Sequence, residues 1–175
     1  GDAIETFDGI TKMPTSLQLA GPANRQGRIA ADNAMSDMKS EYRGVIGTWI
    51  VKIFDMTAAQ TGLSEKRLKL LKKPFTKTYI HPTDHASYYP DAKPMSIKLL
   101  FDPENGAVLG AQIVGAAGVD KRIDVLATAV SGGMTVEDLS HLELAYAPPY
   151  SSAKDPINVA GMVGSNMMQG LCKPI

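Results

Sequence analysis

The chain has few of the features that mark proteins of the membrane, the cell exterior or the nucleic-acid machinery. It has one cysteine, Cys172, so no internal disulfide can form and a reducing cytoplasm is the expected compartment. No apolar run approaches ~18 residues, and no basic segment precedes an apolar stretch, so we expect neither a membrane-spanning helix nor a signal peptide. Lysine and arginine number 18 and aspartate and glutamate also 18, which gives no net charge to attract nucleic acid or an anionic membrane.

The composition is that of a folded domain. Hydrophobic residues make up 44% of the chain, which is enough for a core. A length of 175 residues suits one domain, or one domain and a fragment of another. The chain begins at Gly1 and not at a methionine, so we interpret it as a piece of a longer protein.

Two regions of different character meet at a polar junction, residues 40–44. Before it, Pro22 is predicted to open a helix in which Ala23, Ala30 and Ala34 recur at helical spacing. We therefore expect residues 1–40 to be the tail of one domain and 41–170 to form a second domain. Residues 171–175 have no periodicity and are expected to be a linker or tail.

The second region mixes strand and helix patterns. Strands are predicted where apolar and β-branched residues run between turn signals, at residues 47–54, 75–80, 95–101 and 107–114. The first of these is largely apolar and predicts a buried strand. The last two are joined by residues 102–106, where proline comes early and Asn-Gly late, as in a hairpin.

Each predicted helix of this region has a capping residue at its start. The predicted helices and caps are 56–61 after Asp55, 63–71 with Ser64, 121–131 after Asp120, a short helix after Thr135, and 157–169 after Asp155-Pro156. Strands, hairpin and helices together predict an α+β domain, an antiparallel sheet with its helices packed on one face.

Residues 145–156 form a stiff loop, because Pro148 and Pro149 fix φ and remove backbone donors. The loop carries Tyr146 and Tyr150 and leads into a capped helix. Such a loop suits a presented surface, either a binding site or a subunit contact. An ordinary turn whose tyrosine rings pack for area is the alternative. A second aromatic turn, residues 86–92, places Tyr88 and Tyr89 before a proline.

Residues 144–161, with their Ser-Ser-Ala-Lys-Asp-Pro core and Asn-Val-Ala-Gly tail, carry a more specific pattern. This stretch resembles the C-terminal dimerisation domain of FAD-dependent pyridine nucleotide–disulfide oxidoreductases. The branch it resembles is the coenzyme A-disulfide reductases, including forms fused to a rhodanese domain downstream. The resemblance covers nearly the whole chain and implies a homodimer. It also implies that residues 1–40 end an FAD-binding α/β domain.

The resemblance implies a parent enzyme that passes a hydride from NAD(P)H to FAD and then electrons to a cysteine that attacks a disulfide. Coenzyme A disulfide, a polysulfide or a persulfide would be the substrate. The redox cysteine lies outside this chain, so the chain alone is expected to be inactive. Asp2 would bind the ribityl chain of FAD, and Ala20 and Gly21 would begin the helix that faces the flavin.

The same resemblance implies that Tyr146, together with Tyr88 or Tyr89, crosses the dimer interface to the partner's redox thiol. The sequence does not choose between Tyr88 and Tyr89. Two alternatives remain open: a non-catalytic homodimerisation module whose tyrosines only pack, and part of an NADH oxidase or peroxidase of the same superfamily.

Three further candidates are interpreted as inert. His81-Pro82-Thr83 has the letters of an acid–base motif of the glutathione-reductase branch, but its position between two strands and the missing Glu partner indicate a chance match. His81 and His85 have no cysteine or third histidine nearby, so no metal site is expected. Cys172 is expected to be a free thiol of the tail.

Overall fold

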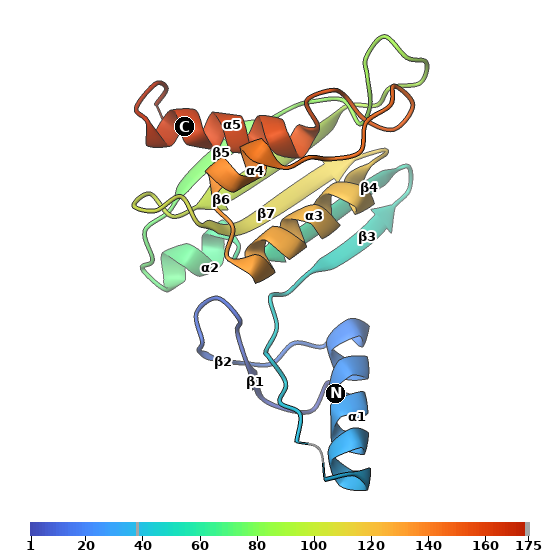
Figure 1. Ribbon diagram of the computed structural model, residues 1–175, viewed down its shortest axis with the longest axis vertical. Helices are drawn as coiled ribbons and strands as arrows, with labels where there is room; N and C mark the ends of the chain where they lie inside the picture. Colours follow the sequence, from blue (N-terminus) through green and yellow to red (C-terminus); the bar gives the residue numbers. More distant parts are fainter. Residues whose placement is uncertain (38, 174–175) are drawn as a thin grey trace. The chain divides into compact units, whose positions relative to one another are not determined.

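The computed structural model describes residues 1–37 and 39–173, which form two compact units, Gly1–Gly47 and Thr48–Ile175 (Figure 1). Residues 174 and 175 of the predicted tail lie outside the described residues. In the first unit, strands β1 (Thr6–Phe7) and β2 (Pro14–Thr15) pair antiparallel. Helix α1 (Ala20–Met35) follows. It begins two residues before the predicted start, because Pro22 sits in the first turn, where its missing N–H removes no helical hydrogen bond.

The second unit is a five-stranded antiparallel sheet in the order β3-β4-β7-β6-β5. Its strands are β3 (Trp49–Ile53), β4 (Met56–Gly62), β5 (Thr76–Ile80), β6 (Met95–Phe101) and β7 (Val108–Gly115). Helices α3 (Val119–Gly132), α4 (Val136–His141) and α5 (Pro156–Met168) cover one face, as Figure 1 shows, and α2 (Glu65–Leu70) joins β4 to β5. The predicted α+β architecture is therefore confirmed.

The core lies between the sheet and the helices on that face. Helix α3 packs on β4 and β7, and α5 packs on β5 and β6. The buried residues include members of the central strands and of the apolar stripe of α3: Ile97, Leu99, Ala111, Ile113, Ile123 and Leu126.

Helices α4 and α5 approach each other at a glycine. A Cβ placed on Gly161 would lie 2.5 Å from the backbone N of Ser140 and 2.7 Å from the carbonyl oxygen of Val136. Both obstacles are backbone atoms, so only glycine fits there without moving a helix.

Two predictions for the first strands of the sheet are wrong. Residues 56–61 form strand β4 and not a helix capped by Asp55, because backbone pairing to both β3 and β7 outweighs the local helix signals. A two-residue turn, Phe54-Asp55, joins β3 to β4, and Phe54 takes a φ of 52°. The usual Asn-Gly signal for such a turn is missing.

Strand β3 is exposed along its whole length and not buried as predicted. It is the edge strand beside β4 in the described sheet, and helix α3 packs on β4 and β7, so the apolar side chains of β3 stay exposed. The predicted start of α3 is also corrected. Gly118, with a φ of 68°, is the N-cap residue, and Asp120 lies within the first turn of the helix.

Candidate functional site

The two tyrosine loops meet through their hydroxyl groups. The hydroxyl of Tyr88 lies 2.9 Å from that of Tyr146, and both side chains are exposed. Tyr89 contacts a different residue: its ring packs edge-on to that of His85, with the ring centres 5.8 Å apart. The structure thus brings Tyr88, and not Tyr89, together with Tyr146. The roles of all three tyrosines stay predictions.

The hydrogen bond between the tyrosines changes the acidity of Tyr146. It raises the pKa of the Tyr146 phenol above its ordinary value, and partial burial adds to the same shift. Tyr146 is therefore neutral at physiological pH, and its hydroxyl can donate a hydrogen bond. A neutral phenol pair on a surface can offer one outward donor, because one of the two protons is used within the pair.

The loop that carries Tyr88 is held by His85. Nδ1 of His85 lies 2.9 Å from Oδ2 of Asp84, and Nε2 lies 3.0 Å from the carbonyl oxygen of Pro90. Both partners are acceptors, so the ring makes both bonds only when both nitrogens carry hydrogen. The bond to Asp84 is the main reason that the pKa of His85 is raised, with the Pro90 bond second.

The loop that carries Tyr146 is closed by its own backbone and by helix α3. The N–H groups of Tyr150 and Ser151 both donate to the carbonyl of Ala147, at 2.9 and 3.1 Å. Nζ of Lys121 in α3 lies 3.5 Å from the carbonyl oxygen of Ala145. The two loops are also joined directly, because the N–H of Ala86 donates to the carbonyl of Ser151 at 3.0 Å.

A buried ionic group lies beneath both loops. Arg122 of α3 is 1% exposed, and its Nη2 lies 2.9 Å from Oδ2 of Asp155. Burial raises the pKa of Asp155, but donors from Ile157, Ser151 and Arg122 outweigh it and leave the pKa below its ordinary value. The sequence prediction that Asp155 caps α5 is confirmed, since it accepts from the N–H of Ile157.

The sequence interpretation missed Arg122 and Ser151. The available signal was periodicity: Arg122 stands next to Ile123 and four residues before Leu126, on the apolar stripe of α3. A charged residue at such a position is buried and must be paired.

The three predicted flavin residues lie in the first unit. Ala20 and Gly21 are the first two residues of α1, and Leu19 before them has no side-chain oxygen to cap the helix. A Cβ on Gly1 would lie 3.9 Å from Cβ of Ala23, so the segment leading to Asp2 passes beside the first turn of α1. The free N–H groups of a helix start suit an electron-rich flavin edge.

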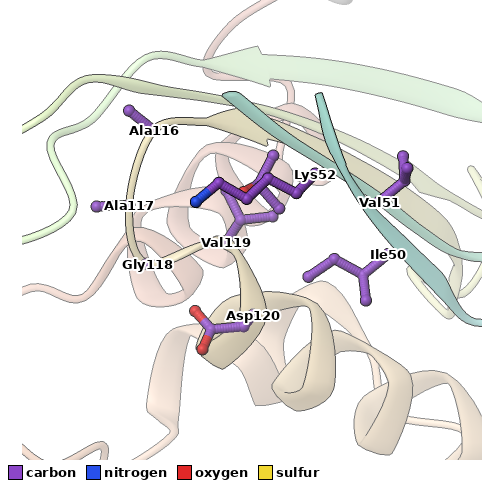
Figure 2. Close-up of a pocket in the computed structure, with 9 residues that line it drawn as sticks. Ile50, Val51, Lys52, Ala116, Ala117, Gly118, Val119 and Asp120 are labelled. Atoms are coloured by element: carbon purple, nitrogen blue, oxygen red, sulfur yellow. The ribbon is translucent and has the colours of Figure 1, made fainter. Parts of the chain in front are cut away.

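A separate pocket of about 340 Å³ lies between β3 and the start of α3 (Figure 2). In Figure 2, Lys52 extends across it toward the loop of residues 116–118, while Asp120 lies at the first turn of the helix. None of the predicted site residues lines this pocket. Its wall includes Gly118, whose carbonyl oxygen lies 3.3 Å from Nη1 of Arg122.

The remaining candidates are placed away from any assembled site. Nδ1 of His81 lies 2.9 Å from the hydroxyl of Ser96, and Cys172 is an exposed free thiol. Within residues 1–37 and 39–173, no group of three or more His, Cys, Asp or Glu side chains is arranged to hold a metal ion. No helix in the described part of the chain is long and apolar enough to cross a membrane.

Comparison with solved structures shows close likeness. The reduced CoADR-RHD of Bacillus anthracis is 50% identical with a TM-score of 0.95, over 99% of this chain and 31% of that one. An NAD-dependent persulfide reductase from A. fulgidus is 39% identical with a TM-score of 0.96, over 100% of this chain and 32% of that one.

Sequence comparison agrees with the structural likeness. A coenzyme A disulfide reductase of Staphylococcus aureus is 40% identical over 161 residues, which are 92% of this chain and 36% of that protein. The chain thus spans about a third of the length of these relatives. Residues 49–156 match the family model described as pyridine nucleotide-disulphide oxidoreductase, dimerisation domain. The chain therefore belongs to the pyridine nucleotide-disulphide oxidoreductase family, whose dimerisation domain it contains.

Proposed function

We propose that the chain forms the dimerisation end of an FAD-dependent, NAD(P)H-using disulfide reductase, and that Tyr88 and Tyr146 act at the partner subunit's redox thiol. The observation that carries this proposal is the 2.9 Å hydrogen bond between the two exposed hydroxyl groups. Exposed tyrosines that only pack have no need of paired hydroxyls. Two such groups on adjoining loops form a small donor surface that a subunit can present to its neighbour.

The chemistry of disulfide reduction suits this surface. FAD, when bound, would take a hydride from NAD(P)H and supply electrons to a cysteine that attacks the substrate disulfide. The sulfur that leaves carries negative charge and must be stabilised or protonated. In the tyrosine pair one hydroxyl donates to the other, and the second hydroxyl keeps its proton for the sulfur. A phenol is neutral at physiological pH, so this hydroxyl has a proton to share with the charged sulfur.

The substrate class follows from the relatives. One is named a coenzyme A disulfide reductase and another a persulfide reductase, so we propose a coenzyme A disulfide or a persulfide for this chain. Asp2, Ala20 and Gly21 would supply part of the FAD site. We also propose a two-fold homodimer, because the tyrosines would otherwise have no thiol to face. The free thiol of Cys172 suits the cytoplasm.

The test is Tyr146→Phe in the full-length flavoprotein, with Tyr150→Phe in the same loop as the control. The ring stays, so the free energy of unfolding should barely change. Loss of one positioned proton donor should slow disulfide reduction roughly 10- to 1,000-fold. Reduction of the flavin by NAD(P)H should be nearly unaffected, and Tyr150→Phe should leave both half-reactions unchanged.

Three other outcomes would reject the proposal. Wild-type rates in both half-reactions of Tyr146→Phe would mean that the tyrosine only packs, as in a non-catalytic dimerisation module. Faster oxidation of the reduced protein by oxygen or peroxide than by coenzyme A disulfide or a persulfide would identify an oxidase or peroxidase. Sedimentation of the full-length protein as a monomer at ~100 µM would remove the interface on which the proposal depends.

A further inference from the structure

The guanidinium group of Arg122 contacts four separate parts of the second unit. Its Nη2 donates to the carbonyl oxygen of Asp84 at 2.7 Å and to the hydroxyl of Ser151 at 3.2 Å. The same nitrogen and Nε lie 2.9 and 3.5 Å from the carboxylate of Asp155. Nη1 donates to the carbonyl of Gly118 at 3.3 Å. Asp84 lies in the Tyr88 loop, between β5 and β6, and Ser151 lies in the Tyr146 loop, between α4 and α5.

The space around this group is shaped for arginine. Gly118 has a φ of 68°, and a Cβ on it would collide with Nη1 of Arg122 and approach Cβ of Asp84 to 3.0 Å. A guanidinium is a planar fork that keeps its charge and donates in several fixed directions, whereas an ammonium is a point charge on a flexible stem. Only the fork can reach the two loops, the carboxylate and the turn together.

A buried ion pair by itself adds little to stability, because desolvation offsets the attraction. The arrangement has a different consequence. Arg122 is bonded to one loop through Asp84 and to the other through Ser151, and those loops contact each other again where Ala86 donates to Ser151. The arginine therefore fixes the position of one loop relative to the other.

From this geometry we infer that Arg122 is a positioning residue that holds the loops of Tyr88 and Tyr146 together, so that their hydroxyls meet. The inference rests on the proposed function only for its catalytic consequence. The coupling of the loops stands on the contacts alone. Lys121, the residue before it, assists from the same helix through its 3.5 Å contact with the carbonyl of Ala145.

The test compares Arg122→Lys with wild type in the full-length protein, and Arg67→Lys in α2 is the matched control. Amide hydrogen exchange is measured across both loops and across β6 and β7. We expect Arg122→Lys to speed exchange roughly tenfold or more at Ala86 and Ser151 together, the scale of losing hydrogen bonds to a charged group. Exchange in β6 and β7 should not change, and Arg67→Lys should match wild type throughout.

A second variant covers the case in which Arg122→Lys does not fold. Ser151→Ala keeps the ion pair and removes the hydroxyl that bonds both Arg122 and Asp155, the latter at 2.6 Å. It should loosen the same two loops more mildly. If only one loop responds in the folded variants, or if neither does, the coupling by Arg122 is rejected.

Half-reaction rates separate this inference from the proposed function. Arg122→Lys should slow disulfide reduction but not flavin reduction by NAD(P)H, and it should add little to the loss already caused by Tyr146→Phe, because both changes affect one donor pair. Loosened loops with an unchanged disulfide rate would support the positioning by Arg122 and reject the tyrosine chemistry. If Arg122→Lys slowed disulfide reduction by the same factor in wild type and in Tyr146→Phe, Arg122 would not act through the tyrosines.

Discussion

Tyr88 and Tyr146 stand 58 residues apart in the chain, yet their hydroxyl oxygens lie 2.9 Å apart. One belongs to the loop between β5 and β6, and the other to the loop between α4 and α5. Neither loop alone would fix such a contact. Both are anchored from below by the same helix, α3, through Arg122.

Changing Tyr88 to phenylalanine should lower the pKa of Tyr146. The hydrogen bond between the two phenols is the largest cause of the raised pKa of Tyr146, so removal of the Tyr88 hydroxyl should return that pKa toward its ordinary value of 10.0. Alkaline titration of the near-ultraviolet phenolate absorbance would show the change, with Tyr150→Phe as control. An unchanged titration of Tyr146 would mean that the hydroxyls do not pair in solution.

The stability of the Tyr88 loop should depend on the charge of His85. Its pKa is raised above the ordinary 6.5 by the bonds to Asp84 and Pro90, so the stabilisation is fully present below about pH 6.5 and is lost as pH rises through the raised value. Asp84 is the charged group in contact with the ring. Denaturant unfolding of wild type and His85→Gln should differ most at acidic pH.

His81→Gln is the control for that experiment, because His81 is exposed and bonds only to the side chain of Ser96 among its described contacts. The difference between wild type and His85→Gln should shrink as the pH rises. A difference that stays constant or grows on going to alkaline pH would contradict the assignment of a protonated His85.

Sequence signals from residues close together in the chain predicted much of this fold. Strand β6 was expected at residues 95–101 and is found there, and the capping residues Ser64, Thr135 and Asp155 each accept a backbone N–H at the start of a helix. These features depend on residues close in sequence. The capping interaction needs only a side-chain oxygen and the next turn of backbone.

The wrong predictions lie where residues distant in sequence determine the local structure. Residues 56–61 carry a helix-like cap signal, but β3 and β7 lie on either side of them and impose a strand. β3 is exposed because of its position at the sheet edge, and the residues of β3 alone do not predict that position. Likewise the tyrosines could be chosen by motif, whereas the choice of Tyr88 over Tyr89 required the fold.

Glu65 should be a source of acid sensitivity. Lys69 lies 2.7 Å from its carboxylate, Lys98 2.5 Å and Lys77 3.2 Å. Lys69 and then Lys98 lower the pKa of Glu65 to about 2, although burial opposes the shift. Because this pKa is depressed, the stabilisation is present above the ordinary value of 4.5 and is lost as pH falls through about 2.

Glu65→Gln should therefore be less stable than wild type at neutral pH, and the two should converge as the pH falls from about 4.5 to about 2. Thermal unfolding across this range measures the difference, with Glu104→Gln in an exposed turn as control. Convergence at a higher pH, or parallel curves throughout, would show that the three lysines do not hold the carboxylate in solution.

Gly161→Ala should destabilise the second unit by separating α5 from α4. The added methyl would meet the backbone N of Ser140 at 2.5 Å and the carbonyl oxygen of Val136 at 2.7 Å, and backbone cannot rotate away as a side chain can. Overpacking of this kind costs about 1–3 kcal/mol, which exceeds the gain of up to ~1 kcal/mol that alanine has over glycine inside a helix.

Gly132→Ala is the matched control, because the nearest atom to its Cβ is Met134 Cγ at 3.8 Å. Denaturant midpoints should fall for Gly161→Ala and stay level or rise for Gly132→Ala. Equal midpoints for the two variants would mean that α4 and α5 do not pack as closely as these contacts require.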